Sequence, residues 1–250
     1  MMKKKGKVFI CGAGPGDPGL VTVRAMELLK MCDVILYDRL VGKEIIDQIP
    51  AKAEKVFVGR TVGDPTTHQD RTNKLMVQHA KKGKTVLRLK GGDPFIFGRG
   101  AEEAEYLIKH GIEFEIVPGI TSAIASPAYA GIPLTHRRHS SSVAIVTGHE
   151  DAEKDELVIR WGRLAGAVDT IVVLMGIEQL GQISNDLVKA GIKKSTRVAI
   201  VESGTTSKQR VVRGTLGTIA AAAKKSEVRP PAVIVIGKVA ALGDTLGWFK

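Results

Sequence analysis

The sequence predicts an α/β protein of two domains, with a mostly parallel sheet in the first domain and a mixed sheet in the second. Short runs rich in β-branched residues alternate with amphipathic stretches along most of the 250 residues. A segment of small residues interrupts this alternation after Pro118. Near the carboxyl end, two strand-like runs follow each other without room for a crossover helix, which indicates a hairpin and therefore a mixed second sheet.

The first half of the chain has the alternation of strands and helices that is typical of a parallel sheet. Runs of β-branched and aliphatic residues predict strands over residues 7–11, 33–37, 55–58, 85–89 and 113–117. Apolar residues at helical spacing predict helices over residues 20–30, 69–81 and 101–109. We expect these helices to cover the sheet.

The second half contains a further series of strands and fewer helices. Strands are expected over residues 143–147, 170–175, 197–201, 210–213 and 232–237, and helices over residues 178–190 and 215–224. The third and fourth of these strands form the expected hairpin. We place the first domain at residues 1–118 and the second at residues 119–250, with a boundary linker over residues 118–133.

The composition indicates a folded protein that attracts anionic partners. With 44% hydrophobic and 25% charged residues, the chain can bury a core, which excludes an intrinsically disordered protein. Lys and Arg number 37 against 26 Asp and Glu, and the net charge of +11 should attract a nucleic acid, a phosphate or a polycarboxylate. Because aromatic residues make up only 4%, the chain lacks the stacking surfaces typical of RNA-binding proteins, and we expect no nucleic-acid partner.

Neither a membrane segment nor a metal site is indicated by the sequence. No apolar run approaches the roughly 18 residues that span a bilayer, and the apolar stretch after residue 7 is too short for a signal peptide. Cys11 and Cys32 lie in apolar contexts, which predicts buried, reduced thiols in a cytoplasmic protein. We expect no metal, because Cys and His have no paired spacing.

A glycine-rich loop, GAGPGDPG at residues 12–19, connects the first predicted strand to the first helix. Its glycines match the G-x-G-x-x-G pattern of NAD-binding folds, with Asp38 at the end of the second strand as the acidic partner. However, its two prolines lack N–H donors, and Asp17 adds negative charge where a pyrophosphate would bind. The loop alone leaves open a nucleotide site of some kind and a structural turn.

A second glycine-rich loop follows the fourth predicted strand, within RLKGGDPFIFGRG at residues 88–100. Gly91 and Gly92 would let a ligand approach the backbone, and Asp93 could accept hydrogen bonds from hydroxyl or ammonium groups. Ligands of open α/β sheets bind beyond the carboxyl ends of the strands, where both glycine-rich loops should lie. A glycine-rich connection beside two core phenylalanines is the alternative interpretation.

Two further segments have a structural and a functional interpretation. In PGITSA at residues 118–123, Thr121 is placed as the N-cap of a helix, and a capped, closely packed helix accounts for the segment without a ligand. The basic segment HRRH at residues 136–139 could bind an anion or form a solvated loop.

Several blocks of the sequence match one protein family in the same order. They are residues 12–18, 37–41, 91–100, 118–122, 127–133, 174–176 and 209–218. In these blocks, which cover nearly the whole chain, the sequence resembles the uroporphyrinogen-III C-methyltransferases of the tetrapyrrole methylase superfamily. The resemblance implies a two-domain tetrapyrrole methylase fold with S-adenosyl-L-methionine in the interdomain cleft. It also implies two successive methylations of uroporphyrinogen III, at C2 and C7, to give precorrin-2, and a homodimeric enzyme.

The resemblance also implies roles for individual residues at matching positions. The family's proposed proton acceptor falls on Asp38, and Arg side chains near the motif loops suit the carboxylates of the substrate. The implied cofactor site consists of Pro15, Gly91, Gly92, Asp93, Ile96, Thr121, Ser122, Met175 and Gly204.

One position departs from the family's pattern. The family usually has Gly-Lys-Arg after the third strand, where the Lys is a proposed proton donor, whereas this chain has Gly59-Arg60-Thr61. Because Arg is effectively never deprotonated, we expect Arg60 to pair with a substrate carboxylate instead of donating a proton. Two other functions remain as alternatives, a sibling methyltransferase acting on a later corrinoid precursor and an NAD-binding oxidoreductase.

Overall fold

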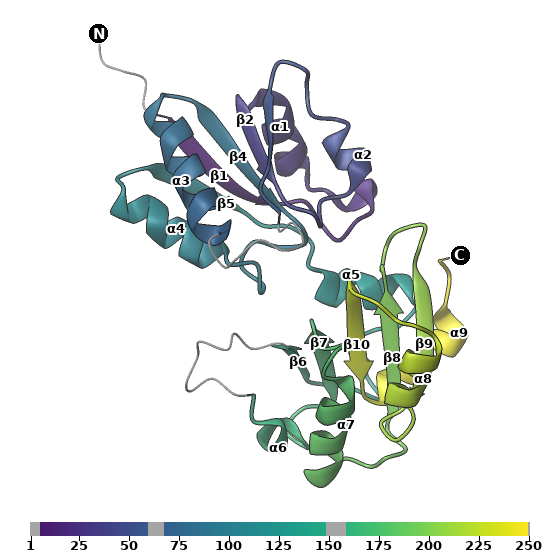
Figure 1. Cartoon of the computed structure of the whole chain (residues 1–250). Coiled ribbons are helices and arrows are strands. Elements are labelled where there is room, and N and C mark those ends of the chain that lie inside the picture. Colours follow the sequence, from purple (N-terminus) through teal and green to yellow (C-terminus); the bar gives the residue numbers. More distant parts are fainter. Residues whose placement is uncertain (1–5, 60–67, 149–158, 250) are drawn as a thin grey trace. The chain divides into compact units, whose positions relative to one another are not determined.

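A computed structural model of the chain describes residues 6–59, 68–148 and 159–249 (Figure 1). The chain divides into two compact units, Met1–Thr121 and Ser122–Lys250, and each is described by itself.

The first unit is a parallel sheet with helices on both faces (Figure 1). Within the described residues the sheet has five strands in the order β3-β2-β4-β1-β5, and every neighbouring pair is parallel. The strands are β1 (Lys7–Gly12), β2 (Val34–Tyr37), β3 (Glu54–Phe57), β4 (Thr85–Lys90) and β5 (Glu113–Val117). The helices are η1 (Pro18–Leu20), α1 (Val23–Met31), α2 (Lys43–Ile46), α3 (His68–Lys81) and α4 (Gly100–Lys109).

Each face of this sheet has its own apolar core. On one face, Leu87 and Leu89 of β4 pack in a cluster with Leu28 of α1 and Ile45 of α2. On the other face, Val86 of β4 belongs to a cluster that includes residues of α3 and α4. Side chains of a strand alternate between the two faces, so a central strand covered on both sides is expected to be apolar throughout.

The second unit contains a mixed sheet with the order β6-β7-β10-β8-β9 among the described residues. The β6 and β7 pair is parallel and the other pairs are antiparallel. The strands are β6 (Val143–Thr147), β7 (Thr170–Leu174), β8 (Arg197–Glu202), β9 (Arg210–Thr215) and β10 (Ala232–Ile236). The other elements are α5 (Ser122–Tyr129), α6 (Trp161–Leu164), α7 (Leu180–Lys189), α8 (Ile219–Lys225), η2 (Lys238–Ala241) and α9 (Gly243–Leu246).

This mixed sheet is also covered on both faces. Buried residues of α7 and α8, such as Leu187 and Ile219, pack with Ile234 of β10 on one face. On the opposite face, Ala123 of α5 packs with Val172 and Val233.

The α/β class and the parallel and mixed sheets are confirmed, with strand ends within two residues of those expected. The first helix was expected from residue 20 but begins at Val23, because residues 18–20 form a separate 3₁₀ turn. The helix expected from residue 215 begins at Ile219, because β9 continues to Thr215.

Candidate functional site

The carboxyl ends of β1, β4 and β5 meet at one edge of the parallel sheet, and the loops that follow them are hydrogen-bonded together. Gly92 N–H donates to the Gly14 carbonyl at 2.7 Å, and Gly14 N–H donates back to the Gly92 carbonyl at 3.2 Å. The Asp93 carboxylate accepts from the N–H of Gly119 at 3.0 Å and from that of Phe95 at 2.8 Å. Three loops that are distant in the sequence therefore form one backbone-lined edge.

Glycine is required for this close approach of the loops. A Cβ on Gly12 would lie 2.5 Å from the Gly92 oxygen, and a Cβ on Gly119 would lie 2.3 Å from the same atom, both shorter than real contacts. Gly92 itself has a φ of +69°, in the left-handed region where side chains are strained. Its neighbour Gly91 lies against Leu40, because a Cβ at position 91 would be 2.5 Å from the Leu40 Cβ.

The loop after β1 does not have the geometry of a dinucleotide-binding turn. The Asp17 carboxylate accepts from Gly19 N–H at 2.7 Å and caps the short η1 turn. Helix α1 starts only at Val23, and its first turn is capped by the Thr22 hydroxyl, which accepts from Ala25 N–H at 3.1 Å. A pyrophosphate site needs the helix N-terminus directly after the loop, so the NAD interpretation is not supported.

Asp38 lies directly after β2, in a short turn beside Gly91. Its Oδ1 accepts from Leu40 N–H at 3.0 Å, and its Oδ2 accepts from the Arg88 guanidinium Nη2 at 3.3 Å. The side chain of Asp38 is 22% exposed, whereas that of Arg88 is 6% exposed. Asp38 therefore combines a fixed orientation with access to solvent.

Beneath Asp38 lies a buried cluster of charged side chains that the sequence analysis missed. One oxygen of Glu103, Oε1, accepts from Arg88 Nε at 3.0 Å, from Lys90 Nζ at 2.9 Å and from Gln69 Nε2 at 3.2 Å. The sequence carried a signal, since β4 places Arg88 and Lys90 at alternate positions of a central strand whose other residues after Thr85 are apolar.

The charges in this cluster shift the pKa values of its members. Burial opposes the ionisation of Glu103, but the nearby charges of Arg88 and Lys90 outweigh it and lower the pKa of this carboxyl. Burial, together with repulsion from Arg88, lowers the pKa of Lys90 despite its bond to Glu103.

In the second unit, three of the expected cofactor residues follow or begin elements at one edge of the mixed sheet. Met175 follows β7 and Gly204 lies beyond β8, and these two strands end opposite the start of β10. Met175 has a φ of +55° and is 53% exposed. Gly204 packs on α5, because a Cβ there would lie 2.3 Å from the Ser126 hydroxyl. The third residue, Ser122, is the first of α5.

The sequence of the chain matches one family of known proteins. A family model described as "Tetrapyrrole (Corrin/Porphyrin) Methylases" matches residues 7–220. The chain belongs to the tetrapyrrole methylase family.

Two relatives and one solved structure align with this tetrapyrrole methylase over almost their full length. It is 52% identical to the "S-adenosyl-L-methionine-dependent uroporphyrinogen III methyltransferase" of Methanosarcina barkeri, over 97% of this chain and 95% of the relative. It is 48% identical to the "Uroporphyrinogen-III C-methyltransferase" of Priestia megaterium, over 94% and 98%. The crystal structure of uroporphyrin-III C-methyl transferase from Thermus thermophilus complexed with S-adenyl homocysteine is 40% identical, with a TM-score of 0.80 over 94% and 99% of the two chains.

The site residues expected in the first unit of this methylase lie in several different segments. The structure brings Asp38 together with the loop over Gly91 to Asp93, and Pro15 lies in the loop after β1 at the same edge. Ile96 is 40% exposed in the segment that follows, and Thr121 is buried at the end of the first unit. Arg60 lies outside the described residues. The roles of these residues stay predictions.

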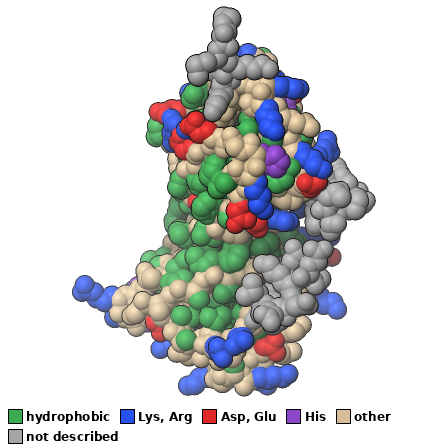
Figure 2. Space-filling model, turned by 90° about the vertical axis from the view of Figure 1, so that its left-hand side faces the viewer, with side chains coloured by type: hydrophobic (Ala, Val, Ile, Leu, Met, Phe, Trp, Pro, Cys, Tyr) green, Lys and Arg blue, Asp and Glu red, His purple; other side chains and the backbone are tan. Residues whose placement is uncertain are grey.

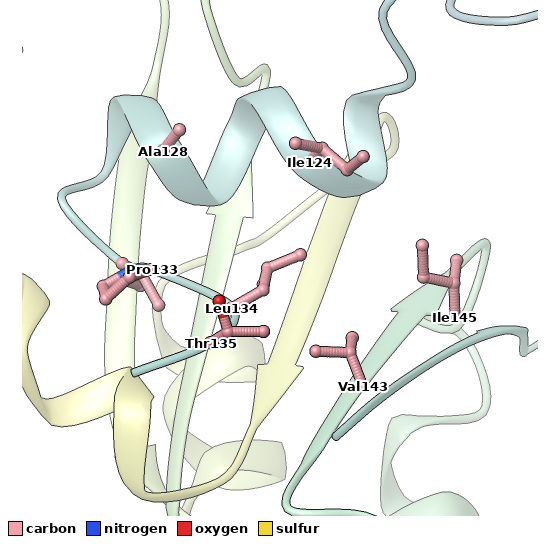
Figure 3. Close-up of a pocket in the computed structure, with 8 residues that line it drawn as sticks. Ile124, Ala128, Pro133, Leu134, Thr135, Val143 and Ile145 are labelled. Carbon is pink, nitrogen blue, oxygen red and sulfur yellow. The ribbon is translucent and has the colours of Figure 1, made fainter. Parts of the chain in front are cut away.

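The second unit of the methylase also has an apolar pocket of about 390 Å³ beside α5. Figure 3 shows Ile124 and Ala128 on the helix, Leu134 below it, and Val143 and Ile145 on β6. The space-filling view faces the side on which β6 lies and shows hydrophobic side chains gathered over this unit (Figure 2). Ile124 is 53% exposed, whereas isoleucine is among the residues most often buried in proteins.

Cys11 and Cys32 are both buried free thiols, as expected. Burial raises the pKa of each to about 12, so neither is an activated nucleophile. No helix in the described part of the chain has both the length and the apolar character needed to cross a membrane. In the same part of the chain, no group of His, Cys, Asp and Glu is arranged to hold a metal ion.

Proposed function

We propose that this protein is an S-adenosyl-L-methionine-dependent C-methyltransferase that converts uroporphyrinogen III to precorrin-2 by successive methylation at C2 and C7. The observation that carries the proposal is the full-length similarity to relatives named for this substrate. The backbone-lined edge beside Asp38 supports it, because it offers a ligand-accessible loop next to a carboxylate.

The site of the cofactor is proposed from the positions that match the family. We assign the cofactor to Pro15, Gly91, Gly92, Asp93, Ile96, Thr121, Ser122, Met175 and Gly204. The loop after β4 fits a ligand because Gly91 and Gly92 leave its backbone without side chains, and each Asp93 oxygen can accept a further hydrogen bond. When bound, S-adenosyl-L-methionine supplies an electrophilic methyl group and leaves as a neutral thioether.

The protein's own residues align the reactants and receive a proton. A carbon-methylation step needs close alignment more than acid catalysis, and hydrogen bonds between Gly14 and Gly92 hold the loop in place before any ligand arrives. Transfer of a methyl cation leaves the tetrapyrrole with one additional positive charge, which it loses when a proton leaves another of its positions. We assign this proton to the Asp38 carboxylate. Arg60 and other Arg side chains bind the carboxylates of the substrate.

We further propose that the enzyme is a homodimer and acts in the cytoplasm. The surface between α5 and β6, defined by Ile124, Leu134, Val143 and Ile145, supports the dimer, because it is apolar and lies beside β6, an edge strand of the mixed sheet among the described residues. A second copy of the chain would cover it. Two free, buried thiols fit a reducing compartment.

The mass of the product tests the proposed function. Uroporphyrinogen III incubated with the purified protein and S-adenosyl-L-methionine should gain two CH₂ units, with S-adenosylhomocysteine formed as the second product. NAD in place of the methyl donor should give no reaction. An unchanged tetrapyrrole mass, with the cofactor intact, would refute the proposal.

A further inference from the structure

The stability of the fold alone does not explain why Arg88, Lys90 and Glu103 form a buried cluster of charged side chains. All three side chains are at most 6% exposed, and β4 could have continued the apolar pattern begun by Val86 on this face. Replacing a buried ion pair by apolar residues is often neutral or stabilising, so a buried salt bridge is weak evidence of a stabilising role.

The cluster has a direct connection to Asp38, and Arg88 makes it. All three guanidinium nitrogens of Arg88 are used: Nε donates to Glu103, Nη1 donates to the Leu89 carbonyl at 3.0 Å, and Nη2 donates to Asp38. A planar guanidinium bound at three corners has one orientation. The hydrogen bonds of Arg88 Nε and Nη1 therefore fix the position of Nη2. Through Nη2 they also fix the preferred position of Asp38 Oδ2.

Glu103 fixes the other end of this connection. It projects from the first turn of α4, is fully buried, and binds Arg88 and Lys90 through a single oxygen. Its second oxygen, Oε2, has no hydrogen-bond partner among the described residues. Arg88 and Lys90 thus both bind Oε1, and Oε2 is left without a bond from either cation. This indicates that Glu103 holds Arg88 in a defined position even though one of its own oxygens is not hydrogen-bonded.

We propose that Arg88 is a positioning residue for Asp38, held in its orientation by Glu103, so that the Asp38 carboxylate is presented to the substrate in one orientation. This inference rests on the proposed function, in which Asp38 accepts the proton released on methylation. Lys90 neutralises Glu103 together with Arg88 but donates no hydrogen bond to Asp38 within the described part of the chain.

Variants of Arg88 and Asp38, alone and combined, test the coupling. Asp38→Asn should lower kcat by about 10²-fold or more, the usual effect of removing a positioned base, with unchanged affinity for S-adenosylhomocysteine. Arg88→Lys keeps the charge but cannot reach both carboxylates, and it should lower kcat about tenfold or more with little change in KM. In the Asp38→Asn background, Arg88→Lys should cause no further loss, because the group it positions is already absent.

The matched control is Lys90→Met, which removes a cation that is equally buried and bonded to the same Glu103 oxygen. It should lower the melting temperature while kcat, measured well below that temperature, stays within about threefold of wild type. A second variant, Arg88→Gln, is uncharged and ends near the position of Arg88 Nε, so it keeps a donor to Glu103 but loses the donor to Asp38. If Arg88→Lys does not fold, Arg88→Gln should show the kcat loss of about tenfold or more in its place.

The outcomes separate this inference from the proposed function. Full activity of Asp38→Asn would refute the role of Asp38 and, with it, the positioning role of Arg88. A large loss in Asp38→Asn alongside wild-type kcat in Arg88→Lys would overturn the inference alone. If the kcat losses of Asp38→Asn and Arg88→Lys multiply in the double variant, Arg88 has only a structural role. The same conclusion follows if Lys90→Met loses as much kcat as Arg88→Lys.

Discussion

Single ionisable side chains in the first unit are buried in two different ways. Arg88 and Glu103 are charged and surrounded by partners, whereas Cys11 and Cys32 are neutral thiols in apolar surroundings. Burial without a partner raises the pKa of a thiol because it penalises the charged form. The buried thiols therefore remain protonated to a higher pH than thiols in water.

The two buried thiols should make the protein less stable at alkaline pH. Their pKa is raised by burial from an ordinary value of 9.0 to about 12, so above pH 9 the unfolded chain loses protons that the folded chain retains. The stability that they contribute is complete below pH 9 and is lost as pH rises towards 12, by about 1.4 kcal/mol per pH unit for each thiol. Urea unfolding at several pH values, compared with a Cys11→Ala/Cys32→Ala variant, measures this loss. If the free energy of unfolding fell equally with pH in the two proteins, the prediction would be contradicted.

Arg60 offers a second test at the residue scale. If Arg60 pairs with a substrate carboxylate, Arg60→Lys should raise KM modestly and leave kcat nearly intact, because Lys keeps the charge but loses the bidentate geometry. A proton donor would behave in the opposite way, since Lys, with a pKa of about 10.4, releases a proton far more readily than Arg. Steady-state kinetics of the two proteins decide between the roles, and a gain in kcat at constant KM would favour the donor.

At the scale of elements, local pattern predicted the regular parts well and the contacts between distant loops poorly. Short runs of β-branched and aliphatic residues were sufficient to predict the described strands, including β3 and β9, which have no fully buried residue. Short helices such as α2 and α6 were missed, since four residues carry no measurable periodicity. The loop over Gly91 to Asp93 was found from its glycines, but its bonds to Gly14 and Gly119 join residues far apart in the sequence.

The surface between α5 and β6 gives a prediction for the second copy of the chain. Ile124→Glu places a charge in the middle of this apolar surface and should shift the protein from dimer to monomer in light-scattering measurements. Val23→Glu is the control, because Val23 is also an exposed apolar residue at the start of a helix and lies outside this surface. A dimer that persists in Ile124→Glu would place the interface elsewhere.

At the scale of the whole molecule, the dominant property is the net charge of +11. The proposed substrate is a polycarboxylate, so long-range attraction should increase its rate of association and its affinity. Ion pairs with such a substrate form at the expense of bound salt ions and water. The cofactor carries little net charge and should gain much less from this field.

Substrate binding should therefore depend strongly on salt. Charges at the protein surface are screened over about 8 Å at physiological ionic strength, and raising salt should increase the KM for uroporphyrinogen III more than the dissociation constant of S-adenosylhomocysteine. Kinetics and calorimetry over the same salt series measure the two quantities. Equal weakening of both would show that the charge serves another purpose, such as solubility.

The contact of Gly12 and Gly119 with the Gly92 oxygen limits how this protein can be re-engineered. Gly12 and Gly119 exclude a side chain because a Cβ there would meet the backbone of another loop, and Gly92 disfavours one because of its positive φ. Since the obstacles are backbone atoms, a second replacement of a neighbouring side chain cannot relieve the crowding. Directed evolution by point mutation is thus confined to the side chains around this edge, such as those of Leu40 and Ile96. New ligand specificity here would have to come from loops of altered length.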